Sequence, residues 1–206
     1  MRIRLSWLIL ICTSVVIPAV LPLTAAARPD LRESVLVAFD GQNGNFVDGL
    51  SMDSAGNLWG VTAWGGTATD CSPAPGCGNV FRLTKSRSGW TLQIIYTFQG
   101  GSDGQYPTGG LVFDAAGNAY GETGSGGSSS CACGTIYEIS LRSGHYEKTE
   151  IYSFSDTSTH NDGEGPFGGL VIDSAGNLYG TTINGGNRFT CNCGTVFELS
   201  PSRRLD

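Results

Sequence analysis

Short apolar runs alternate with polar turns along most of the chain, and helical periodicity is absent from these segments. The clearest example begins with an apolar run at 110–113, a polar turn at 114–118 and a returning segment at 119–123. Residues 134–140 then alternate apolar with polar side chains, which is typical of a strand with one buried face. Residues 149–154 add a fourth strand. We therefore expect four short antiparallel strands per unit, which is the composition of a propeller blade.

The same pattern occurs three times at a spacing of about sixty residues, which indicates a repeat architecture. Each copy contains an apolar run, Asp-x-Ala-Gly-Asn, a variable residue, an aromatic residue and glycine, with the aspartates at Asp53, Asp114 and Asp173. Aspartate favours the start of a turn because its carboxylate accepts hydrogen bonds from backbone amides, while Gly and Asn tolerate positive φ. We therefore interpret the three aspartates as turn residues rather than as catalytic or calcium-binding groups.

The predicted fold is all-β, a propeller-like array of three four-stranded antiparallel blades of about sixty residues. The repeat units are expected near residues 49–107, 108–166 and 167–200. The last unit lacks a fourth strand, and residues 34–40 resemble one, so this N-terminal strand is expected to complete the last blade. Three blades fall below the roughly four to eight of known propellers. This leaves open a homodimer that completes a six-bladed ring, a fragment of a longer array, or a β-trefoil-like fold.

Residues 1–27 have the layout of a signal peptide for export. Two arginines precede an apolar stretch at 5–23, and the three alanines at 25–27 supply a small-residue cleavage site. Prolines interrupt the apolar stretch, which disfavours a retained membrane anchor. Residues 28–206 are then expected to form a single exported β-repeat domain with no membrane span, in a secreted, periplasmic or cell-surface location.

Removal of the signal peptide takes away one of the seven cysteines and leaves one pair in each repeat. The pairs are Cys71 and Cys77, Cys131 and Cys133, and Cys191 and Cys193. An even count in an oxidising compartment predicts disulfides. Residues i and i+2 of an extended strand lie about 6.6–7 Å apart at Cα, at the limit of a disulfide, so the connectivity stays open between tight turns and cross-links between loops. Metal binding by Cys-x-Cys is less favoured, because two of the pairs have no histidine nearby.

The charge of the chain disfavours nucleic acid and anionic membranes as partners. Residues 1–27 hold two of the 12 basic residues and none of the 18 acidic ones, which leaves ten basic against eighteen acidic residues, a net charge of −8. Binding to nucleic acid needs clustered basic residues. The chain also lacks a dinucleotide fingerprint, a phosphate loop, a nucleophile elbow and a paired-histidine metal motif. The sequence accordingly predicts no catalytic residue, no cofactor and no metal site.

The third copy, from Gly169 to Ser200, resembles the GloVer tandem repeat of "choice-of-anchor" bacterial proteins. The resemblance rests on Gly-Leu-Val-x-Asp-Ser-Ala-Gly-Asn-Leu-Tyr-Gly-Thr-Thr, a Gly-Gly pair and Cys-Gly-Thr-Val-Phe-Glu-Leu. It covers about residues 34–200, and the first copy departs most, with Asn79 in place of Thr and Arg82 at an acidic or lysine position. The resemblance implies an exported bacterial repeat protein with a propeller-like fold, and it brings no established activity with it.

Candidate ligand contacts gather on one face of the predicted blades. The loops that carry the cysteines and the loops between repeats lie opposite the Asp-x-Ala-Gly-Asn turns, and loops on a rigid scaffold often carry function. Aromatic side chains beside amides and carboxylates suit a sugar or peptide ligand, although the same aromatics can instead cap the core. The candidates are Trp64, Tyr106, Asp103, Asp162, Asn184, Arg188 and Phe189.

The function favoured by these features is an exported, non-enzymatic module that binds a glycan or a surface protein. One alternative is a propeller-type hydrolase or lyase acting on carbohydrate, with Asp162, Glu164 or Glu122 as acid and base. Such chemistry needs two carboxyl groups placed around one bond, one of them with a raised pKa. A further alternative is a truncated structural fragment of a longer repeat array.

Overall fold

The computed structural model describes most of the chain, namely residues 31–69, 71, 75–155, 162–186 and 191–201. Every strand described lies in one compact unit that begins at Val35. The expected signal peptide and the candidates Arg188 and Phe189 lie outside the described residues. Within the described part, regular helix is confined to one short 3₁₀ turn, η1 (Gly101–Asp103), so no helix there is long and apolar enough to cross a membrane.

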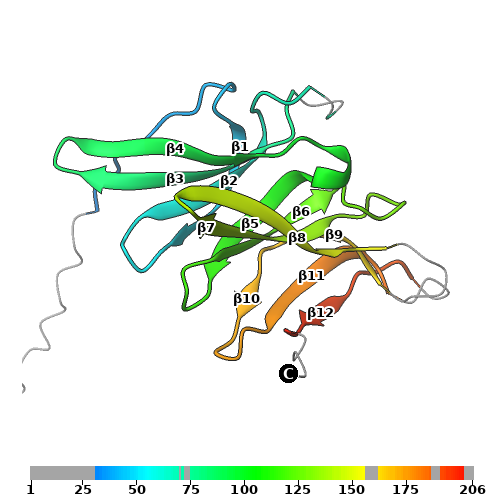
Figure 1. The fold of residues 1–206 in the computed structure, drawn as a ribbon. Coiled ribbons are helices and arrows are strands. Elements are labelled where there is room, and N and C mark those ends of the chain that lie inside the picture. Colours follow the sequence, from blue (N-terminus) through cyan, green and yellow to red (C-terminus); the bar gives the residue numbers. More distant parts are fainter. Residues whose placement is uncertain (1–30, 70, 72–74, 156–161, 187–190, 202–206) are drawn as a thin grey trace, which may run out of the picture. The chain divides into compact units, whose positions relative to one another are not determined.

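The strands form three antiparallel sheets that follow one another along the chain (Figure 1). The first sheet contains β1 (Asn45–Met52), β2 (Leu58–Trp64), β3 (Asn79–Ser86) and β4 (Gly89–Thr97). The second sheet contains β5 (Gln105–Phe113), β6 (Ala119–Ser125), β7 (Thr135–Arg142) and β8 (His145–Ser153). The third sheet contains β9 (Gly163–Pro166), β10 (Val171–Ile172), β11 (Leu178–Gly185) and β12 (Val196–Leu199). The prediction of an all-β chain with one antiparallel sheet per repeat is thus confirmed.

The first strand of each sheet is irregular at the same place. In β1 and β5 the register with the second strand shifts at a glycine, between Asp48 and Leu50 and between Thr108 and Val112. In the third sheet the shift becomes a break, because β9 and β10 are separate strands that both pair with β11. The glycine needs to lack a side chain, since a Cβ on Gly109 would lie 2.5 Å from the backbone of Gly169 in the next sheet. The first strands of consecutive sheets therefore approach each other closely.

The N-terminal strand expected over residues 34–40 is the one element that the structure does not contain. These residues form no strand, and the described part of the third sheet has no counterpart of β4 or β8. Phe39 instead packs edge-on against Phe81 of β3, with ring centroids 5.0 Å apart. The prediction of an intrachain strand was wrong because it rested on local resemblance, whereas a strand also needs a neighbouring edge with which to pair. The first strand of the second sheet also begins at Gln105, ahead of the expected repeat boundary.

Each Asp-x-Ala-Gly-Asn segment forms the predicted turn. Asp53 Oδ1 accepts hydrogen bonds from the amides of Ala55 (3.0 Å) and Asn57 (2.8 Å), and Oδ2 accepts from Asn57 Nδ2 (2.8 Å) and Trp59 Nε1 (2.9 Å). The other two copies repeat every bond, with a tyrosine hydroxyl 3.1 Å away in place of the indole. Burial raises the pKa of Asp53, but these hydrogen bonds outweigh it and hold the pKa below its usual value. The aromatic residue of the motif is thus part of the turn.

Two hydrophobic clusters fill the spaces between consecutive sheets. We call the side of a sheet that packs on the next sheet its front face, and the side that packs on the preceding sheet its rear face. The first cluster joins the front of the first sheet to the rear of the second, through Trp59, Val61, Val80, Leu111, Ala119, Tyr137 and Ile139. The second joins the front of the second sheet to the rear of the third, through Ile136, Leu170 and Leu178. Each sheet therefore uses one face toward each neighbour.

A phenylalanine packs edge-on against an aromatic ring on the third strand of each sheet. Phe98 and Phe154 follow the fourth strand of the preceding sheet. The pairs are Phe39 with Phe81, Phe98 with Tyr137 and Phe154 with Phe197, at centroid distances of 5.0, 5.2 and 5.1 Å. Phe39 thus lies where the end of a preceding fourth strand would lie, although no sheet precedes it in the described residues.

The cysteines of each repeat are placed as a disulfide within that repeat. The Cα atoms of each pair lie 5.2 Å apart, closer than in an extended strand. In the second pair, Ala132 has a φ of 54°, and this left-handed residue folds the chain between Cys131 and Cys133. A tight turn therefore accounts for the pairing of Cys131 with Cys133, and all three pairs lie within one repeat. The first pair is buried in the cluster between the first and second sheets, whereas the third pair is exposed.

We expect replacement of Cys71 and Cys77 by alanine to lower the free energy of unfolding by about 2 kcal/mol. Their disulfide closes the longest of the three loops, with a sequence separation of 6 against 2, and both side chains are buried. The same replacement at the exposed Cys191 and Cys193 should cost clearly less. Urea denaturation of both variants under oxidising conditions measures the difference. Equal losses would show that loop length and burial do not determine the contribution of these disulfides.

Candidate functional site

The loops that carry the cysteines and the links between sheets meet at one end of the sheets. The Tyr106 amide, at the start of β5, donates to the carbonyl of Cys77 (3.1 Å), and the Gly165 amide of β9 donates to the carbonyl of Cys133 (2.8 Å). The Gly127 amide donates to the Gly101 carbonyl in the link before β5 (2.9 Å). We call this end the cysteine-loop face. It carries the described members of the predicted site.

An exposed aromatic pair lies on this face of the first sheet. Trp64, the last residue of β2, is 37% exposed, and Phe46 of β1 is 64% exposed. Their ring centroids lie 5.2 Å apart with the planes tilted by 36°. Phe46 has a φ of 57°, a left-handed conformation that is rare for a bulky side chain and often marks a functional position. Exposed aromatic surface held by such backbone is suited to stacking against a ligand.

Sequence reasoning identified Trp64 and missed Phe46. A signal was present, because Tyr106 is the counterpart of Phe46 in the second repeat and has nearly the same φ, 58°. Tyr106 itself is only partly exposed and packs against the cluster between the first and second sheets. The two interpretations of the aromatic candidates therefore apply to different residues: Tyr106 caps the core, and the Trp64 ring is open to solvent.

The carboxylate of Asp103 binds groups within the chain. Its Oδ1 accepts hydrogen bonds from the Tyr96 hydroxyl (2.7 Å) and from Lys148 Nζ (3.1 Å), and its Oδ2 accepts from the Gln99 amide (2.8 Å). Burial and the bond to Asp103 raise the pKa of Tyr96. Because Lys148 belongs to β8 and Tyr96 to β4, Asp103 ties the fourth strands of two sheets to the link between them.

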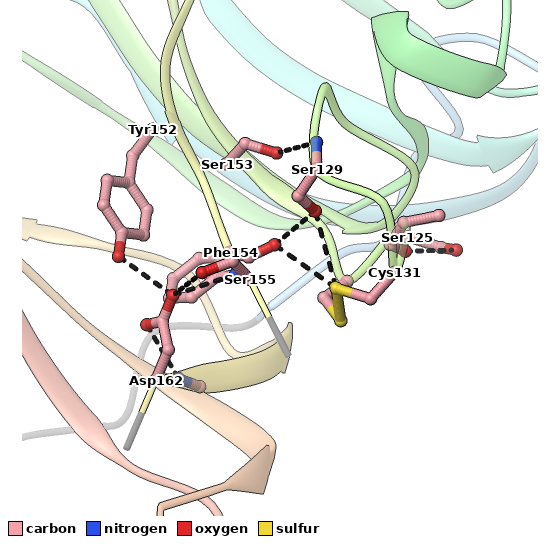
Figure 2. Close-up of a disulfide and its surroundings, with 11 residues drawn as sticks. Ser125, Ser129, Cys131, Tyr152, Ser153, Phe154, Ser155 and Asp162 are labelled. Carbon is pink, nitrogen blue, oxygen red and sulfur yellow. Dashed lines mark hydrogen bonds between the residues drawn. A yellow bond between two sulfur atoms is a disulfide. The ribbon is translucent and has the colours of Figure 1, made fainter. Parts of the chain in front are cut away.

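Asp162 ties the fourth strand of the second sheet, β8, to the link that follows it (Figure 2). Its Oδ2 accepts from the Tyr152 hydroxyl and the Ser155 amide, both at 2.9 Å, and its Oδ1 accepts from the Gly163 amide at 2.8 Å. Burial, followed by the bond to Asp162, raises the pKa of Tyr152 to about 12. Both aspartates that were predicted to contact a ligand thus position the backbone that leads into the next sheet.

The cysteine loop of the second sheet is fastened to the end of β8, as Figure 2 also shows. Ser129 Oγ donates to the Phe154 carbonyl (2.5 Å), and the Ser129 amide donates to Ser153 Oγ (3.1 Å). Cys131 lies within the same loop. The cysteine loop of the second sheet and the Phe154 backbone are therefore held together at the second junction.

The remaining described candidates lie on the third sheet. Asn184 of β11 pairs in register with Glu164 of β9, and both side chains are partly exposed. The neighbouring Ile183 is exposed. These residues belong to the third sheet, whereas Phe46 and Trp64 belong to the first. The aromatic pair on the first sheet is therefore the best-defined part of the predicted site.

Glu122 of β6 is fully buried at the junction between the second and third sheets. Its Oε1 accepts from the Gly169 amide (2.7 Å) and from Thr108 Oγ1 (3.2 Å), and its Oε2 has no partner in the described part of the chain. Burial raises the pKa of Glu122 to about 7, these two bonds lower it in part, and the Asp48 carboxylate raises it. A side chain with no exposed surface is placed to join sheets rather than to reach a substrate.

Two hollows lie between the second and third sheets, and neither opens among the aromatic candidates. One, of about 610 Å³, is lined by the turns at 113–116 and 172–176. The other, of about 540 Å³, lies between Tyr120, Glu138 and Tyr152 of the second sheet and Leu199 of β12. Over the residues described here, no group of three His, Cys, Asp or Glu side chains is arranged to hold a metal ion.

Comparison with known proteins gives a family and nothing more specific. The sequence matches the family described as Gloeobacter/Verrucomicrobia repeat over residues 26–205, which includes all three sheets. No curated protein matches the chain. This result agrees with the resemblance seen in the repeated motifs.

Proposed function

Because the chain belongs to the Gloeobacter/Verrucomicrobia repeat family, we propose that it is an exported, non-enzymatic repeat module that binds a glycan through its cysteine-loop face. The exposed Phe46–Trp64 pair carries this proposal. Sugar rings present C–H groups that stack on aromatic faces, and polar side chains at the edge supply hydrogen bonds. Asn45, exposed and in register with Trp64, offers an amide beside the rings.

A propeller-like arrangement and export are part of the same proposal. Three consecutive antiparallel sheets, each packed face to face on the next, support blades arranged around an axis. Disulfides in every repeat are typical of an oxidising compartment, and residues 1–27 have the layout of an export signal. Two of the three carboxylates considered for an enzyme, Asp162 and Glu122, have positioning partners within the chain.

We expect Trp64→Ala and Phe46→Ala each to weaken glycan binding by about tenfold, because a stacking contact contributes up to about 1.5 kcal/mol. A glycan array on the oxidised protein identifies the ligand, and isothermal titration calorimetry gives the dissociation constants. Trp90→Ala is the control, since Trp90 lies at the opposite end of the first sheet, in the β3–β4 hairpin.

A peptide array in parallel tests the alternative class of ligand. Unchanged binding by both variants would remove the aromatic pair from the site. Binding to peptides alone, weakened by the same variants, would keep the site and replace the glycan with a protein ligand.

A further inference from the structure

Positions that are buried on the front faces of the first two sheets are exposed on the third. Val80 of β3 and Ile136 of β7 are both 0% exposed, because each packs against the rear of the following sheet. Their counterpart in the third sheet, Val196 of β12, is 82% exposed. Val171 and Ile183 on the same face are exposed as well. The third sheet thus presents an apolar front face of the kind that elsewhere contacts another sheet.

The rear face of the first sheet shows the complementary situation. Leu111 and Leu170, on the first strands of the second and third sheets, are 2% and 6% exposed. Their counterpart Leu50 is 57% exposed, and the neighbouring Met52 and Val47 are exposed too. One repeated interface is therefore formed twice within the chain, and its two halves remain uncovered on the outer sheets.

Phe39 and Asp40 lie against the first sheet as the residues that follow a fourth strand lie against the second and third sheets. Phe39 packs on Phe81 as Phe98 packs on Tyr137. The amide that follows Phe39 donates to Asn43 Oδ1 at 3.0 Å. In the same way, the amides that follow Phe98 and Phe154 donate to the carboxylates of Asp103 and Asp162. Residues 35–38, which lead into Phe39, have the sequence of a strand without being paired, and Val35 and Leu36 are exposed.

The third sheet has room for such a strand. At the first junction, Tyr146 of the fourth strand β8 packs on Trp59 (5.5 Å between centroids) and its hydroxyl accepts from Arg82 Nη1 (2.6 Å). At the second junction the corresponding space is the hollow of about 540 Å³, bounded by Tyr120, Glu138 and β12. In the described residues β12 pairs on one side only, with β11. An open edge of this kind accepts an added strand.

We propose that two copies of this chain associate head to tail, with the front face of each third sheet packed on the rear face of the other copy's first sheet. In each junction, residues 35–38 of one copy pair with β12 of the other and complete its third sheet. The amide of Phe46 then faces the carbonyl of Cys193 across the junction, as Tyr106 faces Cys77 within the chain. Two such junctions related by a twofold axis close the assembly at six sheets, within the range of about four to eight for propellers.

A second copy of the chain fits these surfaces because the front face of the third sheet and the rear face of the first sheet are the two halves of one repeated interface. A front face needs a rear face of the same repeat, and the described residues leave one of each uncovered. Leu50, Val196 and residues 35–38 carry this association. Phe46 borders the same junction, because its counterpart Tyr106 packs against the cluster between the first and second sheets, so association and ligand binding are expected to compete for the Phe46 ring.

Light scattering after size-exclusion chromatography tests the proposal on the purified protein. We expect twice the mass of one chain at micromolar concentration, and the mass of one chain for Val196→Asp and for Leu50→Asp. Both substitutions replace exposed side chains, so each variant should keep the circular dichroism of the parent protein. Leu141→Asp, at an exposed apolar residue of the β7–β8 hairpin, is the control and should leave the mass doubled.

Mixing the two variants distinguishes the head-to-tail arrangement from other dimers. An equimolar mixture of Val196→Asp and Leu50→Asp contains one unmodified junction per pair, so the doubled mass should be partly restored. Amide hydrogen exchange at residues 35–38 should slow in the doubled species. The proposal would be overturned by the mass of one chain at every concentration, by a doubled mass for the Leu50→Asp variant, or by an open series of larger masses.

Discussion

Replacing Phe98 with alanine is expected to lower the free energy of unfolding by about 3–5 kcal/mol. The ring is fully buried and makes edge-on contacts with Tyr96 and Tyr137, each at 5.2 Å between centroids. Its removal leaves a cavity in the cluster that joins the first and second sheets, and the surrounding strands cannot close around it. Urea denaturation followed by the fluorescence of Trp59, which belongs to the same cluster, measures the loss.

Phe39→Ala is the matched control, because Phe39 makes the equivalent contact on the first sheet but is only partly buried. In the Val196→Asp background, where the protein is expected to be monomeric, Phe39→Ala should lower the free energy of unfolding by about 1 kcal/mol, because Phe39 buries a smaller apolar area. Equal losses for the two variants would mean that the Phe98 ring contributes no more than a half-exposed contact, and that the junction is stabilised elsewhere.

The strands and turns could be predicted because both depend on local pattern. Alternation of apolar and polar side chains marked β7, since side chains in a strand point alternately to two faces. Asp53 was correctly assigned to a turn, because the carboxylate binds amides only two and four residues away. Even here, the reason for the aromatic at Trp59 emerged only from the structure, where its Nε1 donates to the same carboxylate.

The site was predicted less well, because the roles of its residues depend on partners far along the chain. Asp103 is separated by 45 residues from Lys148, whose ammonium it binds, and Glu122 by 47 from Gly169. A single sequence shows these carboxylates as polar residues in loops or strands and gives no sign of their partners. Phe46 was missed for another reason, since the identity of an aromatic residue does not reveal that its backbone is left-handed.

Glu122→Gln is expected to stabilise the protein above neutral pH and to leave it nearly unchanged in mild acid. The pKa of Glu122 is raised from 4.5 to about 7, so the folded state binds this proton more tightly than the unfolded state does. The favourable contribution is complete below pH 4.5 and is lost as the pH rises toward 7. Above that pH the buried charge costs about 3 kcal/mol, and glutamine, which carries no charge, avoids this cost.

Glutamine is the informative replacement because its side-chain oxygen can still accept from the Gly169 amide and Thr108 Oγ1, as Glu122 Oε1 does. Urea denaturation at pH 5 and pH 8 should therefore give the variant a gain of up to about 3 kcal/mol at pH 8 and little change at pH 5. Glu147→Gln, at an exposed carboxylate of β8, keeps Glu122 and should keep the pH dependence of the parent protein. A variant that is destabilised equally at both pH values would instead show that the junction between the second and third sheets needs the carboxylate itself, with its charge held by the Gly169 amide.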